Sequence, residues 1–186
     1  MKQFKAFLAV AALSVAGCGI SGDTADGRQT GASAGVNVSV QRAPATTTST
    51  TLTVEAAEQG GGVRLAVAAT GLPPGEHGLH VHEVGRCDGP AFTSAGAHWN
   101  PASRKHGRDN PAGAHAGDLP NLTVDAAGRG RTEFVIPDAT LVGGGRPMYD
   151  EDGAALLVHA KADDYKTDPS GDSGDRIACS VLSPAK

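Results

Sequence analysis

Short stretches in which apolar and polar residues alternate follow one another along most of this chain. A period of two predicts strands with one buried and one exposed face, and Gly- or Pro-rich turns separate the stretches. No stretch has the 3.6-residue period of an amphipathic helix. The predicted strands cover residues 36–41, 46–58, 63–69, 79–85, a hairpin over 122–137, 154–160 and 176–182. About eight such strands predict an all-β fold, an antiparallel sandwich or barrel.

Two long segments interrupt this alternation. Residues 85–118 are polar and rich in Gly, Pro, Asn and His, and residues 163–175 are also irregular. Loops of this length inside a compact domain are usually functional or disordered. Because these two contain side chains that bind metals, we expect them to be functional.

The N-terminal segment differs in character from the rest of the chain. Two lysines precede an apolar run from Ala6 to Gly17, which is too short to span a bilayer because a membrane helix needs about 20 residues. The segment is typical of a secretory signal peptide, so we expect residues 1–17 to be cleaved. Residues 18–36 are rich in small and polar residues and predict a flexible tether. The folded domain should then comprise residues 37–186.

The signal segment ends in Val15-Ala16-Gly17-Cys18, which resembles the lipobox of bacterial lipoproteins, where the cysteine carries lipid. Cys18 is therefore a candidate membrane anchor, and we expect an exported protein of the bacterial cell envelope or periplasm. The alternative is an ordinary cleaved signal in which Cys18 is incidental. The chain has three cysteines; if Cys18 carries lipid, Cys87 and Cys179 remain as a pair that an oxidising compartment would allow to bond.

Charge narrows the choice of partners. The chain has 186 residues, 16 basic and 20 acidic, for a net charge of −4. Loss of residues 1–17 would remove two lysines, leaving 14 basic against 20 acidic residues and a net charge of −6. Such a balance disfavours nucleic acid as a partner, and it equally disfavours a general anionic membrane surface.

Histidines provide the candidate chemistry. His80 and His82 are separated by one residue on a predicted strand, so their side chains should point the same way about 6.6 Å apart and can converge on one metal ion. Two half-exposed histidines without a partner would be the plain alternative. Further candidate ligands follow in the long loop and at the end of a later strand: His98, His106, His115, Asp118 and His159. Imidazole and carboxylate groups bind zinc and copper, so the whole set favours a metal centre.

The number of candidate ligands suggests two ions. Two four-coordinate sites need eight ligand positions, and the seven candidates fill them if one imidazole binds through both of its nitrogens. Water could fill the missing position instead.

Six blocks of the sequence resemble the copper,zinc superoxide dismutases. In order they are GLHVHE, TSAGAHWNP, KHG, HAGDL, LLVHAKADD and GDRIACSV, within a resemblance that extends from about Leu52 to the C-terminus. It implies an eight-stranded antiparallel Greek-key β-barrel, also described as a sandwich, with long metal-binding and electrostatic loops. It also implies an oxidoreductase that converts superoxide to dioxygen and hydrogen peroxide, with one copper and one zinc ion per chain.

The resemblance assigns the metal ligands residue by residue. The copper ligands would be His80, His82, His98 and His159. The zinc ligands would be His98, His106, His115 and Asp118, with His98 bridging the two ions. Asp163 corresponds to the aspartate that accepts hydrogen bonds from one copper histidine and one zinc histidine, here His80 and His106. Such a residue fixes ring orientation and tautomer.

Other residues acquire roles by the same resemblance. Cys87 and Cys179 correspond to the intrachain disulfide, and His77 to a buried structural histidine that binds no metal. Arg176 corresponds to the arginine beside the copper, which attracts and orients the superoxide anion. His98 would be an imidazolate between the oxidised metals, and on reduction it would leave copper, take up a proton and supply it to the peroxide.

The sequence also departs from the family pattern or leaves choices open. The first disulfide cysteine lies where bacterial members have it, and the loop after Asp163 is short. Of the charges that guide substrate there, Lys166 is a candidate, the alternative being a solvated loop lysine. Monomer and homodimer stay open. The competing function is a non-catalytic copper- and zinc-binding module of the same fold, which catalytic turnover by the metallated protein would exclude.

Overall fold

The computed structural model describes residues 49–184 and 186. Within them the chain forms one 3-10 helix, η1 (Thr93–Ala95), and eight strands: β1 (Thr51–Gln59), β2 (Gly62–Thr70), β3 (Gly75–His77), β4 (Leu79–His82), β5 (Leu122–Val124), β6 (Arg129–Pro137), β7 (Ala154–His159) and β8 (Arg176–Ser183). In this part of the chain no helix has the length and apolar character needed to cross a membrane. The predicted signal peptide (1–17), the tether (18–36) with Cys18, and the strand predicted over 36–41 lie outside the described residues.

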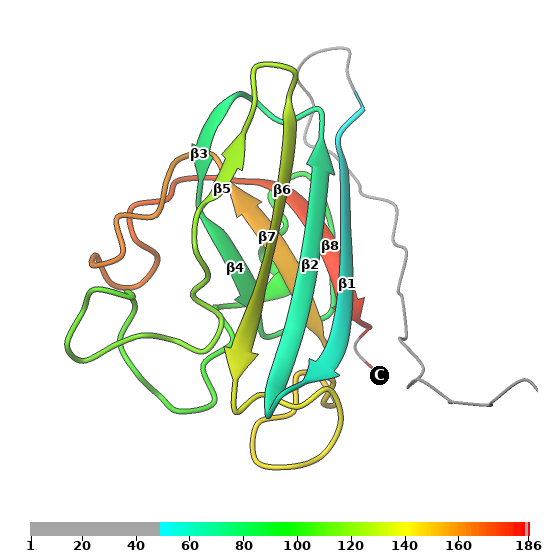
Figure 1. The fold of residues 1–186 in the computed structure, drawn as a ribbon, viewed down its shortest axis with the longest axis vertical. Coiled ribbons are helices and arrows are strands. Elements are labelled where there is room, and N and C mark those ends of the chain that lie inside the picture. The colour runs from blue at the N-terminus through cyan, green and yellow to red at the C-terminus, as the bar shows by residue number, and fades with distance from the viewer. Residues whose placement is uncertain (1–48, 185) are drawn as a thin grey trace, which may run out of the picture. The chain divides into compact units, whose positions relative to one another are not determined.

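The strands form two antiparallel sheets (Figure 1). One has the order β1-β2-β6-β5-β3 and the other the order β4-β7-β8. β6 lies beside β2 although β3, β4 and β5 intervene in sequence, which is the connectivity of a Greek key. β6 pairs with β2 along its whole length, from Gly62 opposite Pro137 to Thr70 opposite Arg129. The predicted all-β antiparallel fold is confirmed.

One strand was not predicted from the sequence. β3 lies within the segment GLPPGEHG, whose Gly and Pro residues predict a turn. It pairs with β5, with Gly75 opposite Val124 and His77 opposite Leu122. A three-residue strand shows no recognisable period, and its partner is far away in the sequence.

Alternation along the strands builds the core. In β1 the side chains of Leu52, Val54 and Ala56 are buried and the residues between them are more exposed. β2 buries alternate residues in the same way, and its buried set joins the same apolar cluster as that of β1. Burial of each large aliphatic side chain contributes about 1.5 to 3 kcal/mol to stability. The core therefore lies between the two sheets.

All six residues of β7 are buried. Leu156 and Val158 face the main core, whereas Ala155 and Leu157 face a second apolar cluster that includes Phe92 and Cys179. A strand covered on both faces is apolar throughout. Its last residue, His159, is consequently held in place by a fully buried strand of the smaller sheet.

The long segment between β4 and β5 returns along β4 and brings polar residues to it. The Val81 N–H donates to the carbonyl oxygen of Gly117 at 2.9 Å, and the Trp99 N–H donates to the carbonyl oxygen of Val81 at 2.8 Å. Isolated bridges pair His80 with Asp118 and His82 with His98. A Cβ atom on Gly117 would lie 2.3 Å from the Val81 carbonyl oxygen, so only glycine permits this approach.

Candidate metal centre

Four histidines meet where β4, β7 and the long loop come together. His80 and His82 extend from β4 and His159 ends β7, while His98 comes from the loop pinned to β4. One ligand nitrogen from each ring lies within 4.8 Å of the others, and all four residues are buried. We call this group of His80, His82, His98 and His159 the first cluster.

A second group surrounds Asp118. Its Oδ1 atom lies 2.9 Å from Nδ1 of His98, 3.1 Å from Nδ1 of His106 and 3.1 Å from Nδ1 of His115. Three imidazole nitrogens therefore converge on one carboxylate oxygen. We call His98, His106, His115 and Asp118 the second cluster. His98 belongs to both clusters.

His80 also lies close to the second cluster, and ligand atoms of His80, His98, His106 and Asp118 lie within 4.8 Å of one another. Its Nε2 atom, however, is engaged with Asp163 at 2.9 Å. The remaining nitrogen, Nδ1, is the one in the first cluster, so we assign His80 to that cluster and keep His115 in the second.

The free ring nitrogens show that both clusters fit metal ions. Nδ1 of His80 and Nε2 of His82 and His159 are buried and have no hydrogen-bond partner, and the buried Nδ1 of His106 faces Asp118 Oδ1 at 3.1 Å. In His82 and His159 the other nitrogen donates to a carbonyl oxygen, that of Gly96 at 3.0 Å and that of Gly174 at 3.0 Å. Proton placement on those nitrogens leaves the unpartnered ones as lone pairs. Buried acceptors without a donor are costly, and a cation would satisfy them.

Burial keeps three histidines of the first cluster neutral. It lowers the pKa of His82 to about 2, that of His159 to about 3 and that of His98 to about 4. Neighbouring histidines lower these pKa values further, and the charge of Arg176 acts in the same direction on His82 and His159. Neutral imidazole is the form that binds metals.

Carboxylates dominate the second cluster. Burial disfavours the charged form of His106, but the hydrogen bonds that His106 donates to Asp118 and Asp163 outweigh it and raise the pKa of His106 to about 9. Burial likewise disfavours ionised Asp118, yet its histidine partners and the Gly107 N–H hold its pKa far below the usual range. The negative charge of Asp118 is thus balanced by protonated His106 in the metal-free protein, and a divalent cation would replace that proton.

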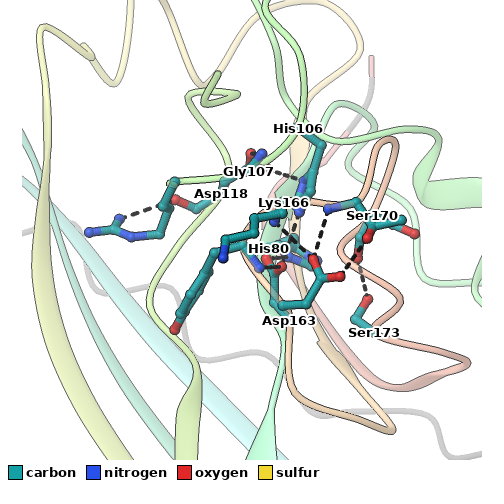
Figure 2. Close-up of polar contacts among 12 residues, drawn as sticks. His80, His106, Gly107, Asp118, Asp163, Lys166, Ser170 and Ser173 are labelled. Atoms are coloured by element: carbon teal, nitrogen blue, oxygen red, sulfur yellow. Dashed lines mark hydrogen bonds and ion pairs between the residues drawn. The ribbon is translucent and has the colours of Figure 1, made fainter. Parts of the chain in front are cut away.

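Asp163 joins the two clusters from the loop between β7 and β8 (Figure 2). Its Oδ2 accepts a hydrogen bond from His80 Nε2 at 2.9 Å, and its Oδ1 accepts one from His106 Nε2 at 3.1 Å. Glycine is required at position 171, because a Cβ there would lie 1.8 Å from Asp163 Oδ1 and the φ angle is +67°. Asp163 therefore contacts one histidine of each cluster.

Arg176 is held beside the first cluster by the loop that follows β4. Its Nη1 donates to the Phe92 carbonyl oxygen at 2.7 Å, and its Nη2 donates to the Gly96 carbonyl oxygen at 2.7 Å. A disulfide between Cys87 and Cys179 ties the same loop to β8. An open depression of about 530 Å³ lies next to Arg176, lined by Pro90, Ala91, Thr93, Gly174, Asp175 and Ile177.

His77 stands apart from both clusters. It is buried, with Nδ1 2.7 Å from the His159 carbonyl oxygen and Nε2 2.8 Å from the Pro73 carbonyl oxygen. Both ring nitrogens are thereby occupied, which agrees with a structural role. Lys166 is exposed in the loop between β7 and β8.

Several residues that support the site were not anticipated from the sequence. The carbonyl groups of Phe92 and Gly96 hold Arg176, and Asn121, Tyr165 and Asp168 link the two long loops. Main-chain groups leave no sequence signal. The other three are common loop residues, and no spacing rule indicates their contacts.

Known proteins with similar sequences identify the family of this chain. Residues 48–182 match the protein-family model described as Copper/zinc superoxide dismutase (SODC). The chain is 46% identical over 123 residues to Superoxide dismutase [Cu-Zn] 1 of Aquifex aeolicus, covering 65% of this chain and 73% of the relative. It is 46% identical over 124 residues to Superoxide dismutase [Cu-Zn] of Caulobacter vibrioides, covering 65% of this chain and 71% of the relative.

A solved structure is similar as well. The crystal structure of a SOD-like protein from Bacillus subtilis superposes with a TM-score of 0.67 at 45% sequence identity. The match covers 69% of this chain and 87% of that one.

Proposed function

The chain belongs to the copper/zinc superoxide dismutase family, and from this premise we propose that its two clusters form the catalytic centre of a superoxide dismutase. The first cluster would hold copper and the second would hold zinc, with His98 between them. The observation that carries this proposal is the set of three buried, unpartnered ring nitrogens in the first cluster. When bound, copper would supply one-electron redox chemistry that oxidises one superoxide and reduces the next, and zinc, which has no redox chemistry, would order the loop.

The rings are already oriented for this task. Hydrogen bonds to the Gly96 and Gly174 carbonyl oxygens place the protons of His82 and His159 on Nδ1, which leaves Nε2 directed into the first cluster. Asp163 orients His80 and His106 by accepting a hydrogen bond from the Nε2–H group of each ring. The protein therefore fixes the ring orientation of four ligands before any ion binds.

His98 is the residue suited to move a proton. Its Nδ1 faces Asp118 and His115 in the second cluster, so Nε2, on the other side of the ring, faces the first. Hydrogen peroxide needs two protons, and we assign one of them to Nε2 of His98. The second would come from water that enters the open depression.

Arg176 would bind the substrate. Burial lowers the pKa of its guanidinium below the ordinary value, and an arginine side chain keeps its charge in proteins. Two of its nitrogens are committed to carbonyl oxygens, and this fixes the plane of the guanidinium. A small anion arriving through the open depression would meet a cation already in place. Lys166 is proposed as a further guiding charge.

The competing proposal is a module that binds both metals without turnover. The protein of Bacillus subtilis, at similar identity, is named only superoxide dismutase-like, so identity alone does not establish catalysis. In this chain four copper-ligand histidines and the arginine are all present around one centre. That completeness favours the enzyme.

We also propose export and a lipid anchor at Cys18. The support is the signal-like segment before it and the disulfide, a bond that persists in oxidising compartments. Either a monomer or a homodimer would serve the proposed reaction, because every proposed ligand comes from a single chain. Analytical ultracentrifugation would distinguish the two.

The experiment that tests the function measures superoxide turnover of the purified protein and its copper and zinc content in the same sample. One copper and one zinc per chain with fast, copper-dependent turnover is the expected result. Two bound metals without turnover would replace the enzyme by the metal-binding module.

A further inference from the structure

Tyr165, in the loop between β7 and β8, makes three contacts around the second cluster. Its main-chain N–H donates to Asp163 Oδ1 at 2.7 Å. Its carbonyl oxygen accepts a hydrogen bond from the Asp109 N–H at 3.0 Å. Its phenol oxygen accepts one from the Asn121 N–H at 2.8 Å. One residue thus contacts the segment of the second cluster both between His106 and Asp118 and just beyond Asp118.

Asn121 connects the Tyr165 hydroxyl to the main chain of Asp163. Its side-chain Nδ2 donates to the Asp163 carbonyl oxygen at 3.0 Å, and its Oδ1 accepts a hydrogen bond from the Asp163 N–H at 2.9 Å. The carboxamide therefore fixes the main chain of the residue whose carboxylate binds His80 and His106. The Tyr165 hydroxyl fixes the main chain of Asn121 in turn.

The backbone at Tyr165 shows that the arrangement is specific. Its φ angle is +62°, in the left-handed region that side chains other than glycine rarely adopt. Gly107 packs directly against it, since a Cβ on Gly107 would lie 2.3 Å from the Tyr165 carbonyl oxygen. Such a conformation persists only where the surrounding contacts hold it.

We propose that Tyr165 is a positioning residue for the metal centre. Its hydroxyl, acting through Asn121, holds the Asp163 carboxylate against His80 and His106 and so sets the zinc affinity of the second cluster. This inference rests on the proposed assignment of zinc to that cluster. Tyr165 touches neither substrate nor a proposed metal ligand through its hydroxyl, so its effect is indirect.

The test is the Tyr165→Phe variant, which removes one oxygen atom and leaves the ring and backbone. The part-buried Asn121 N–H then has no acceptor. A lost hydrogen bond of this kind should weaken zinc binding by about 5- to 30-fold, measured by competition with a chelator. The ring N–H protons of His80 and His106 should also exchange faster with solvent in NMR spectra of the reduced, fully metallated protein.

The chain provides a matched control in its other tyrosine. Tyr149 is half-buried against the main core, and Tyr149→Phe removes the same atom away from the centre. Its zinc affinity and histidine N–H exchange should equal those of the wild type. In an Asn121→Ala background, Tyr165→Phe should add little, because the path to Asp163 is already broken.

The outcomes separate this inference from the proposed function. If the wild type binds no zinc at the second cluster, the functional proposal fails. If the wild type binds zinc and Tyr165→Phe binds it within twofold, with unchanged N–H exchange, the positioning role is wrong even where the melting temperature falls. Fully additive effects of the two substitutions would also overturn it.

Discussion

Arg176 and His82 donate hydrogen bonds to the same oxygen atom, the main-chain carbonyl of Gly96. The residue proposed to bind substrate and a residue proposed to bind copper are therefore held by one peptide group. A shift of that peptide would move both together. The loop that contains Gly96 is tied to β8 by the Cys87–Cys179 disulfide. The disulfide therefore helps to fix the position of His82 and Arg176 through the Gly96 carbonyl group.

Replacing Arg176 by alanine should slow superoxide turnover by about 10- to 100-fold, because electrostatic steering and substrate orientation are both lost. The dependence of the rate on ionic strength should flatten while both metals stay bound. Stopped-flow kinetics with metal analysis would measure this. Arg131→Ala, which removes the same charge from an exposed position on β6, serves as the control, and unchanged kinetics in Arg176→Ala would remove the arginine from the mechanism.

Replacing Cys87 and Cys179 together by alanine should lower the free energy of unfolding by about 4 to 5 kcal/mol, as expected for a long closed loop. The two cysteines are 92 residues apart in sequence. Turnover should fall too, since the loop no longer fixes Phe92 and Gly96. In an Arg176→Ala background the cysteine substitutions should cause little further loss of rate. An equal loss in both backgrounds would show that the disulfide does not act through Arg176.

Replacing Cys18 by alanine should release the exported protein from membranes, because the proposed lipid would have no attachment site. Membrane fractionation of cells that express the full chain measures this, with a Ser21→Ala variant in the same segment as the control. Retention of the Cys18→Ala protein in the membrane fraction would refute the lipid anchor.

Replacing Ser180 by alanine should stabilise the protein by about 1 kcal/mol, because its buried hydroxyl has no hydrogen-bond partner and is costly to desolvate. Ser173 is the matched control, since it is equally buried but its hydroxyl donates to the Ser170 carbonyl oxygen at 2.8 Å. Ser173→Ala should therefore destabilise. Urea unfolding of both variants tests the pair, and destabilisation by Ser180→Ala would mean that its hydroxyl is satisfied in solution.

The metal-free protein should be most stable near neutral pH. His82, His98 and His159 have folded-state pKa values of about 2, 4 and 3, below the ordinary 6.5. The unfolded chain then binds more protons below pH 6.5, so stability falls on acidification, by up to about 1.4 kcal/mol per pH unit for each histidine.

His106 acts in the opposite direction. Its folded-state pKa of about 9 lies above the ordinary value, so its contribution is complete below pH 6.5 and is lost as the pH rises through 9. Urea unfolding from pH 4 to 10 should therefore give a maximum in the free energy of unfolding near neutral pH. A free energy of unfolding that does not change with pH would contradict the shifted pKa values of these four histidines.

The sequence supports the fold and the list of candidate ligands, but only part of how the ligands are held. Alternation predicted the long strands, because one buried face leaves a period of two. It missed β3, whose pairing with β5 depends on residues more than forty positions away. The candidate ligands were found because imidazoles are few and their spacing is specific.

The supporting contacts were not predictable in the same way. The His106 N–H donates to Asp168 at 2.8 Å across 62 residues of sequence, and both residues lie in loops without periodicity. Gly96 acts through its carbonyl group, which every residue possesses. Contacts of this kind become visible only when the tertiary structure brings two loops together.

The two clusters differ in what supports them. In the first cluster His80, His82 and His159 belong to β4 and β7, which pair with each other. All four residues of the second cluster, the shared His98 included, come from the segment between β4 and β5. Sequence changes in that segment would therefore remove the second cluster entirely, whereas three imidazoles of the first cluster would remain on their strands. The strands supply three of the proposed ligands, and the loop between β4 and β5 must supply the others.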